Sequence, residues 1–220
     1  MTPTSLSESR IFSPAGFRDR VQSALSAPQG EDRTEPSDFD LNPEMAAVRP
    51  HPDALATARP AAVLIPAIAR STVTLLFTQR TDHLAAHAGQ IAFPGGKAEP
   101  FDADPLATAL REAREEIGLD STLVTPLGTL ARYLTGTGFH ITPVIGLVDP
   151  DFVLAIDDNE VAETFEVPLP FLMNPNNYQL HSQTIGGHER RFYAVPYEGR
   201  FIWGATAGIL HNMHQRLFAP

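Results

Sequence analysis

Cysteine is absent from the 220-residue chain, and clustered basic residues are missing as well. Without cysteine the protein cannot form a disulfide, a zinc–thiolate site or a thiol nucleophile. Lysine and arginine together number 16, against 26 aspartate and glutamate residues, so the formal net charge is −10. Because proteins that bind nucleic acids neutralise phosphates with clustered basic side chains, no duplex nucleic acid is an expected partner. An acidic enzyme that acted on phosphates would need a metal cation to bring them in.

Long apolar runs are also missing. The N-terminal residues include no apolar segment of the kind found in secretory signals. The most apolar stretch, residues 61–78, is interrupted by Pro66, Arg70 and Ser71, whereas a membrane-spanning helix needs about 20 predominantly apolar residues. We therefore expect two strands joined near Arg70, no membrane partner and a cytoplasmic location. The sequence leaves open whether the protein is a monomer or a homodimer.

Composition divides the chain near residue 55. Residues 1–55 are rich in Pro, Ser, Asp and Glu, which predicts a partly flexible N-terminal arm that builds no part of the core. Phe17, Val21 and Leu25 recur at helical spacing, so one short helix is predicted within the arm. The second half of the arm has the composition of a linker. Residues 56–220 are predicted to form a single domain.

The order of predicted elements indicates the α/β (α+β) class, with a mixed sheet between helices. One helix is predicted over residues 105–117, since Asp104 is a good N-cap and Gly118 suits the position after a helix. A second helix is predicted at the C-terminus, at residues 203–217. Residues 160–167 fit either a strand or a short helix. Branched and aromatic residues predict strands at residues 61–68, 72–78, 91–94, 123–130, 140–148, 152–156, 178–185 and 191–197.

The helix predicted at residues 105–117 carries three glutamates within an arc of roughly 100° on the side opposite its apolar face. Mutual repulsion of three carboxylates is unfavourable unless water or a cation screens it. Magnesium is held by a few carboxylates plus substrate phosphates. The pattern therefore suits a metal site that binds a diphosphate, although an acidic helix face is more often an ordinary solvated surface. The glutamates are Glu112, Glu115 and Glu116, and the apolar face is formed by Leu106, Leu110, Ala113 and Ile117.

A Gly-rich loop, PGGKAEPFDAD, precedes this helix, and its backbone can approach a ligand closely. Taken with the loop, the helix resembles the Nudix box, whose second half reads Arg-Glu-apolar-x-Glu-Glu-x-Gly-apolar. The first half matches if the loop is one residue longer, with Gly96 at the glycine position and Asp102 at the acidic position. The second half is matched by Arg111, Glu112, Ala113, Glu115, Glu116, Gly118 and Leu119.

The loop and the preceding strand resemble the coenzyme A pyrophosphatase branch of that family. FPGGKAEPFD is similar to the branch pattern FPGGK-x-D/E-P-x-D, but Ala85 occupies the place of a signature arginine. Either other cations such as Arg80 and Lys97 bind the phosphates, or the enzyme prefers substrates without the 3'-phosphate of coenzyme A. The resemblance covers residues 61–217. The matching signature positions are Thr78, Arg80, Gly89, Phe93, Pro94, Gly95 and Gly96.

The resemblance implies an α/β/α sandwich and hydrolysis of coenzyme A to 3',5'-ADP and 4'-phosphopantetheine, with water activated by Mg²⁺ or Mn²⁺. It implies that Arg111 positions a glutamate by a bidentate pair rather than contacting substrate. The implied metal ligands are Glu112, Glu115, Glu116 and the carbonyl of Gly96. The implied substrate contacts are Arg80, Gly95, Gly96, Lys97 and His87.

Other roles and other substrates stay open. Glu160, Glu163 and Glu166 are all candidates for a general base, and the sequence does not choose between them. ADP-ribose or a dinucleoside polyphosphate could replace coenzyme A as the substrate. A non-catalytic Nudix-fold binding module usually loses box glutamates, all of which are kept here, and a scaffold protein would show no metal dependence.

Two further residue types are interpreted as structural. His211 and His214 have the spacing of two metal ligands, but the sequence offers no third ligand, so packing or surface roles are expected. Trp203 is expected in the core.

Overall fold

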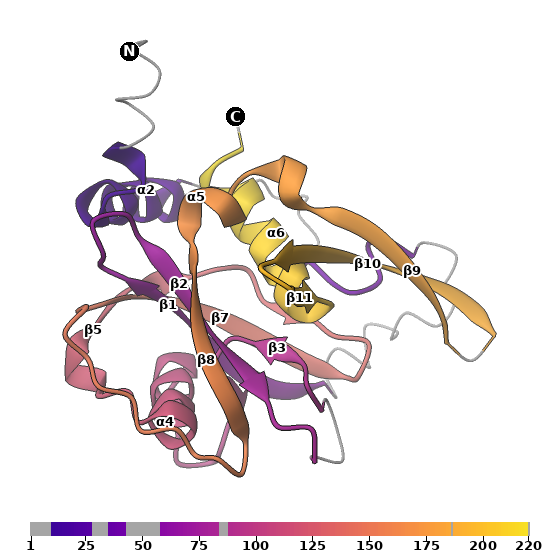
Figure 1. Ribbon diagram of the computed structural model, residues 1–220, viewed down its shortest axis with the longest axis horizontal. Coiled ribbons are helices and arrows are strands. Elements are labelled where there is room, and N and C mark those ends of the chain that lie inside the picture. The colour runs from indigo at the N-terminus through magenta and orange to yellow at the C-terminus, as the bar shows by residue number, and fades with distance from the viewer. Residues whose placement is uncertain (1–9, 28–34, 43–57, 84–87, 186, 220) are drawn as a thin grey trace.

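Two helical layers enclose an eight-stranded mixed sheet in the computed structural model (Figure 1). The structure describes residues 10–27, 35–42, 58–83, 88–185 and 187–219. The large sheet consists of β1 (Arg59–Ile68), β2 (Thr74–Arg80), β3 (Ile91–Ala92), β4 (Gly95–Lys97), β5 (Val124–Thr129), β6 (Tyr133–Leu134), β7 (Phe139–Val148) and β8 (Val161–Pro168). A second sheet consists of β9 (Gln179–Ile185), β10 (His188–Tyr197) and β11 (Arg200–Trp203). The helices are α2 (Pro14–Ser26), α4 (Pro105–Ile117), α5 (Leu169–Leu172) and α6 (Ala205–Leu217).

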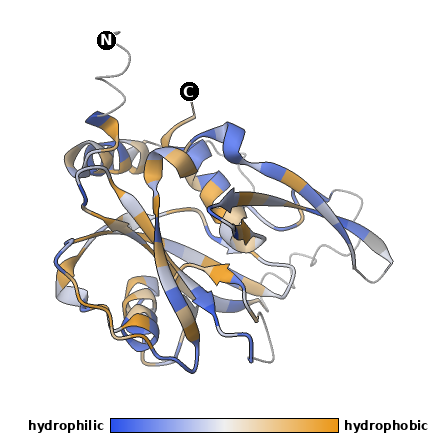
Figure 2. Cartoon of the chain, in the orientation of Figure 1, coloured by the Kyte–Doolittle hydropathy of each residue, from blue (hydrophilic) through white to orange (hydrophobic). Residues whose placement is uncertain are grey.

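The centre of the large sheet is the parallel pair β1 and β7, which runs from Arg59 opposite Phe139 to Ile68 opposite Val148. Strands at the centre of such a sheet are covered on both faces and are therefore apolar along their length. One face of β1 packs in a cluster with α4. The other face joins a cluster that includes side chains of α2 and α6. The predicted α/β/α sandwich is confirmed, and Figure 2 shows hydrophobic residues along these strands and mixed character on the helices.

The helix predicted at residues 105–117 is confirmed as α4. The side chain of Asp104 accepts a hydrogen bond from the backbone N–H of Ala107 at 2.8 Å, as an N-cap does. Gly118 ends the helix with a φ of 67°, a left-handed conformation that favours glycine. No helix in the described part of the chain is long and apolar enough to cross a membrane.

Residues 152–156 do not form the predicted strand. The segment runs beside α4, and Phe152, Leu154 and Ile156 are half buried against the cluster under that helix. The backbone N–H of Ala155 donates to the carbonyl of Ile117 at 2.9 Å, and that of Asp157 donates to the carbonyl of Glu116 at 3.0 Å. The last carbonyls of a helix lack partners within the helix. The segment satisfies them and so does not pair with the sheet.

The C-terminal third differs from expectation in one place. Of residues 160–167, which fitted a strand or a helix, all but Glu160 lie in β8, and the strand pair predicted at residues 178–185 and 191–197 is confirmed as β9 and β10. The last helix begins at Ala205 rather than Trp203, because β11 precedes it. Trp203 lies on β11, half buried, with its ring 5.2 Å from that of Phe192. The expectation that Trp203 lies in the core is therefore wrong.

The short helix predicted in the N-terminal arm is confirmed as α2. Phe17 and Val21 are both 0% exposed and belong to the main core cluster. Leu25 packs against the same cluster. The expectation that the arm builds no part of the core is wrong, because the polar average of residues 1–55 conceals one apolar stripe at helical spacing.

A second part of the arm, residues 35–42, also packs on the domain rather than forming a free linker. Asp38 accepts hydrogen bonds from the hydroxyl of Tyr133 at 2.9 Å and from the backbone N–H of Gly136 at 2.8 Å. The side chain of Asn42, 1% exposed, bonds to the backbone of Arg191 on β10. These contacts tie the large sheet and the small sheet to one segment.

Candidate active site

Arg111, near the middle of α4, is the hub of the predicted site. Its Nε and Nη2 atoms donate to the two carboxylate oxygens of Asp102, each at 3.0 Å. Its Nη1 atom donates to Glu112 at 2.9 Å and to Glu115 at 2.8 Å. The bidentate partner is therefore Asp102 rather than a glutamate, and Arg111 positions two box glutamates through single hydrogen bonds.

Asp102 fixes the loop before α4 as well as Arg111. Its carboxylate, 5% exposed, also accepts hydrogen bonds from the backbone N–H of Glu99 and the hydroxyl of Thr108, both at 2.9 Å. The hydrogen bonds from Arg111 hold the pKa of Asp102 well below its ordinary value. Counting back along the box had put Asp102 at the acidic position, but only the fold identifies its four donors.

Glu116 is the most buried glutamate of the box, with 6% of its side chain exposed. It lies between α4 and β4, where the backbone N–H of Gly95 donates to its Oε2 at 3.2 Å. Burial raises the pKa of Glu116 to about 8, and the charges of Glu112 and Glu160 add to the increase. The helical wheel alone predicted that Glu116 faces away from buried surface. That is wrong because β4 covers this side of the helix.

Glu112 lies one turn earlier on α4, against the backbone of β4. A Cβ atom added at Gly96 would lie 2.6 Å from its carboxyl group, so a larger residue would have to displace the carboxylate of Glu112. Burial raises the pKa of Glu112, although the hydrogen bond from Arg111 acts in the opposite direction. Glu115 differs from both, because its side chain is 60% exposed.

Arg80, at the end of β2, reaches the same cluster from the sheet. Its Nη1 atom is 3.8 Å from Glu116, and its Nη2 atom is 3.9 Å from Glu160. Its Nε atom is buried and has no hydrogen-bond partner among the described residues. At these distances the ion pairs of Arg80 are long, so its N–H groups can donate hydrogen bonds to a phosphate.

Of the three candidate general bases, only Glu160 lies near the box. Its charge is among those that raise the pKa of Glu112 and of Glu116. The loop that holds it is tied to β2, since the backbone N–H of Thr81 donates to the carbonyl of Glu160 at 3.1 Å. The side chain of Glu160 is 51% exposed and so accessible to water.

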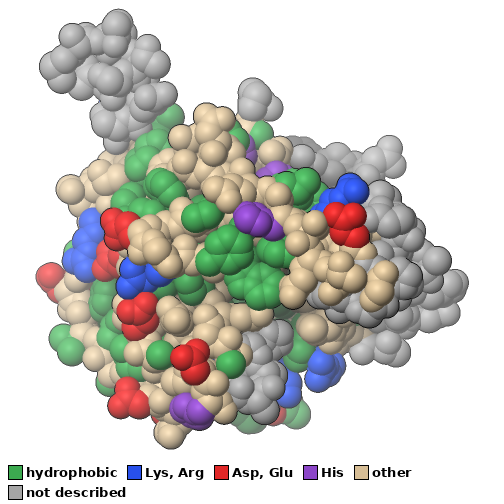
Figure 3. Space-filling model, turned by 45° about the vertical axis from the view of Figure 1, so that its right-hand side comes forward, with side chains coloured by type: hydrophobic (Ala, Val, Ile, Leu, Met, Phe, Trp, Pro, Cys, Tyr) green, Lys and Arg blue, Asp and Glu red, His purple; other side chains and the backbone are tan. Residues whose placement is uncertain are grey.

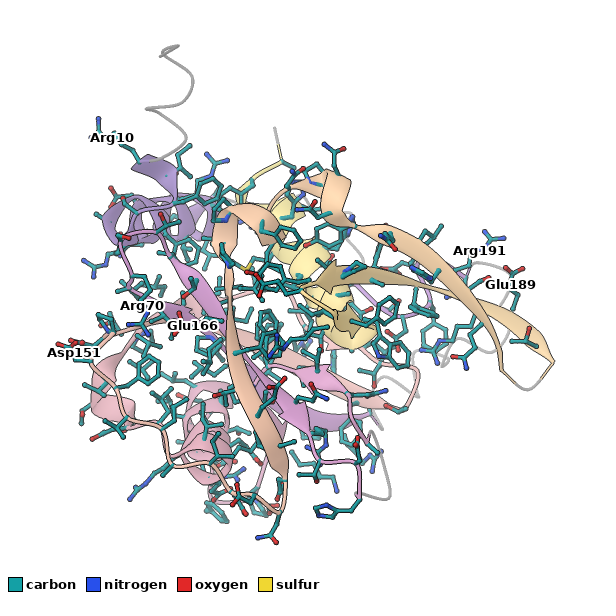
Figure 4. The ribbon with its side chains drawn as sticks, viewed as in Figure 1. Arg10, Arg70, Asp151, Glu166, Glu189 and Arg191 are labelled. Carbon is teal, nitrogen blue, oxygen red and sulfur yellow. The ribbon has the colours of Figure 1, made fainter. Side chains whose placement is uncertain are left out.

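The other two candidates are held in ion pairs elsewhere. Glu163 accepts hydrogen bonds from Arg200 at 3.0 and 3.2 Å. Glu166 accepts from Arg70 at 2.7 Å and from Thr74, and Figure 4 shows Arg70 and Glu166 close together. Burial alone would raise the pKa of Glu166, but these hydrogen bonds lower it below its ordinary value.

The remaining predicted residues fall into three groups. Lys97 contacts the site through its backbone carbonyl, which accepts a hydrogen bond from Arg111 at 2.9 Å, while its side chain is exposed. His87 and Ala85 lie outside the described residues. His211 stacks on Tyr193 with ring centroids 4.3 Å apart, in keeping with the packing role expected for it.

The donor set fits a hard divalent cation. Within the described ranges, no group of three or more acidic or histidine side chains is already arranged to hold a metal ion. Nevertheless, Glu112 and Glu116 are partly or largely buried carboxylates whose charges repel each other, and the pKa of each is raised. A bound cation would offset both the burial and the repulsion. Carboxylate and carbonyl oxygens are the ligands that magnesium and manganese prefer.

Comparison with known proteins gives matches over most of this chain. The family model described as NUDIX domain matches residues 58–179. The chain is 47% identical over 164 residues to the Nudix hydrolase NudL of Yersinia pestis, covering 74% of this chain and 81% of that protein. The NudL protein of Yersinia pseudotuberculosis matches to the same extent. Among solved structures, the MutT protein from Methanosarcina mazei Go1 overlaps with a TM-score of 0.46 and 16% identity, over 72% of this chain and 93% of that one.

Proposed function

Because the chain belongs to the Nudix hydrolase family and is a pyrophosphohydrolase, we propose that it hydrolyses the diphosphate bond of coenzyme A. The products would be 3',5'-ADP and 4'-phosphopantetheine. The observation that carries the proposal is the contact of Arg80 and Gly95 with Glu116. Both contacting residues belong to the stretch that resembles the coenzyme A pyrophosphatase branch, and Glu116 belongs to the general box. The branch-like residues therefore lie beside the carboxylates of the candidate catalytic centre.

The cofactor of the proposed reaction is Mg²⁺ or Mn²⁺. Glu112, Glu116 and the carbonyl of Gly96 would hold it, with Glu115 as a further ligand or an aid to water activation. A bound divalent cation lowers the pKa of a coordinated water and offsets charge that develops on phosphate oxygens. Family membership supports a divalent cation in general, and the oxygen donors support these two metals.

The chain's own side chains have separate roles in this proposal. Arg111 holds Glu112 and Glu115 in place and is itself held by Asp102. Arg80 binds the diphosphate, since its guanidinium carries a permanent charge and its contacts with carboxylates are long. Glu160 accepts the proton of the attacking water. It is the only one of the three candidates beside the box, and it is accessible to water.

A substrate panel tests the proposal. Coenzyme A, dephospho-coenzyme A, ADP-ribose and diadenosine polyphosphates are each incubated with Mg²⁺, with Mn²⁺ and with excess chelator, and products are identified by mass spectrometry. We expect the highest kcat/KM for coenzyme A and no turnover in chelator. Reaction in heavy-oxygen water assigns the attacked phosphorus, because only one of the two products then carries the label.

Two variants control this panel for contaminating hydrolases. Glu112→Gln alters the proposed metal site and should be inactive, whereas Glu189→Gln alters an exposed glutamate of the β9–β10 hairpin and should match the wild type. A higher kcat/KM for ADP-ribose than for coenzyme A would reject the coenzyme A assignment. It would also agree with the departure of Ala85 from the branch signature.

A further inference from the structure

The small sheet ends in an exposed strand. Its order is β11–β10–β9, so β9 is at one edge. β11 pairs only with the Ala194–Tyr197 part of β10. Beyond Ala194, β9 and β10 form a two-stranded hairpin that projects from the body of the molecule (Figure 1). A two-stranded hairpin is at best marginally stable in water, so such a hairpin usually needs a further element against it.

The two edges of this hairpin are treated differently. On β10, the side chain of Asn42 accepts from the backbone N–H of Arg191 at 2.7 Å and donates to its carbonyl at 3.0 Å. The backbone at this point of β10 is thereby satisfied by a buried side chain. Among the described residues, no strand pairs with the outer side of β9.

The sequence of β9 lacks the features that protect an edge strand. Natural edge strands are blocked by charged residues, proline or bulges, whereas QLHSQTI contains no charged residue and no proline. Its pairing with β10 is continuous from Gln179 to Ile185, without a bulge. Leu180 is 58% exposed, and Ser182, Gln183 and Thr184 are exposed as well. Figure 3 shows hydrophobic side chains and a histidine gathered near the centre of the face that is turned to the viewer.

We propose that β9 pairs antiparallel with β9 of a second copy of this chain. A two-fold axis perpendicular to the sheet keeps each side chain on its own face, so one residue must lie opposite itself. Ser182 is the central residue of β9, and placing it on the axis is the register that pairs the whole strand.

This register brings together compatible side chains. Leu180 of one copy faces Thr184 of the other, His181 faces Gln183, and the two Ser182 hydroxyls face each other. None of these pairs places like charges together, and directly opposed residues in antiparallel strands interact strongly enough to set the register. Because β9 itself carries no charged side chain, an identical strand meets no like charge in this register, which favours a second copy as the occupant.

The experiment measures molar mass by sedimentation velocity on the full chain, over a range of protein concentrations. The wild type should shift toward twice the chain mass of 23.9 kDa as concentration rises. Ser182→Lys and Ser182→Glu each place two like charges on the axis and should remain at 23.9 kDa. An equimolar mixture of the two variants should recover the doubled mass, because the charges are then complementary.

Two controls separate this interface from general effects. Val153→Lys changes an apolar residue that is 88% exposed outside β9, and it should dimerise like the wild type. Arg191 lies opposite Ser182 on β10, so thermal melting of each variant checks that the hairpin itself is intact. The proposal is overturned if the wild type stays at the mass of one chain, if the single variants still dimerise, or if Val153→Lys dissociates. Failure of the mixture to recover the doubled mass overturns the register with Ser182 on the axis.

Discussion

The guanidinium of Arg111 and the carboxylate of Asp102 form a two-pronged ion pair, with both donor–acceptor distances at 3.0 Å. Asp102 comes from the loop and Arg111 from the helix, so the pair connects the two halves of the box. The same guanidinium holds Glu112 and Glu115. Asp102 therefore acts on the carboxylates of the site without touching them.

Asp102→Asn should reduce activity through Arg111. An amide cannot neutralise the guanidinium, so Arg111 would shift toward the glutamates and compete with the metal for their oxygens. We expect about a 10–100-fold loss of activity, and half-maximal activity at a higher Mg²⁺ concentration than in the wild type, as for other residues that orient metal ligands. The measurement is kcat as a function of Mg²⁺ concentration. Glu99→Gln, an exposed change in the same loop, should behave like the wild type, and an unchanged metal titration in Asp102→Asn would contradict the role.

Glu112→Gln and Glu116→Gln should each lower kcat by at least about a hundredfold, since metal stabilisation of charge is worth several kcal/mol. The assay is hydrolysis of coenzyme A with saturating Mg²⁺ or Mn²⁺. Glu189→Gln is the matched control, because its side chain is at the far end of the hairpin in Figure 4. Near-normal turnover in either box variant would remove these residues from the site.

Stability of the metal-free protein should fall as pH rises from about 4.5 to about 8. In the folded protein burial raises the pKa of Glu116 from its ordinary value of 4.5 to about 8. The folded state therefore binds the proton more tightly, so its stabilising effect is complete below the lower value and is lost through the higher one. The loss should be a few kcal/mol at most. Urea unfolding in chelator at several pH values measures it, and Glu116→Gln should flatten the curve in this window.

Glu160→Gln should lower the catalytic rate far more than Glu163→Gln or Glu166→Gln. Removal of a general base typically costs about 10²–10⁴-fold in rate, so we expect a loss in that range for Glu160 alone. Glu163→Gln and Glu166→Gln break ion pairs with Arg200 and Arg70, and should affect stability more than kcat. The readout is the pH profile of kcat, in which only Glu160→Gln should abolish the acid limb. Equal rate losses in all three variants would contradict this choice.

The N-terminal helix should contribute to stability. Phe17→Ala removes a fully buried ring from the core and should cost about 3–5 kcal/mol in the free energy of unfolding. Phe101→Ala, at a residue that is 75% exposed, should cost little. Truncation before Ala56 removes Phe17 and Val21 together and should lower the melting temperature or the solubility. A truncated chain as stable as the full one would return the arm to the dispensable role that its composition suggests.

Local patterns in the sequence determined α4 and its position in the chain. Asp104 and Gly118 mark its two ends by hydrogen bonding and backbone conformation, which depend on a few neighbouring residues. The spacing of Arg111, Glu112 and Glu116 put their side chains within reach of one site for the same local reason. Most strands followed from runs of branched residues. The prediction failed at residues 152–156, where the partner proved to be the end of a helix, and it missed the short strands β4, β6 and β11.

Only the tertiary structure decided which charges lie near one another and which are buried. Glu160, Glu163 and Glu166 are equivalent in sequence, yet long-range contacts with Arg200 and Arg70 engage two of them and leave Glu160 beside the box. Glu116 becomes a buried carboxylate because β4, which lies about twenty residues earlier, covers it. A helical wheel gives the direction of a side chain but not what stands opposite. Burial and pKa depend on that opposing surface, which the chain supplies only after it has folded.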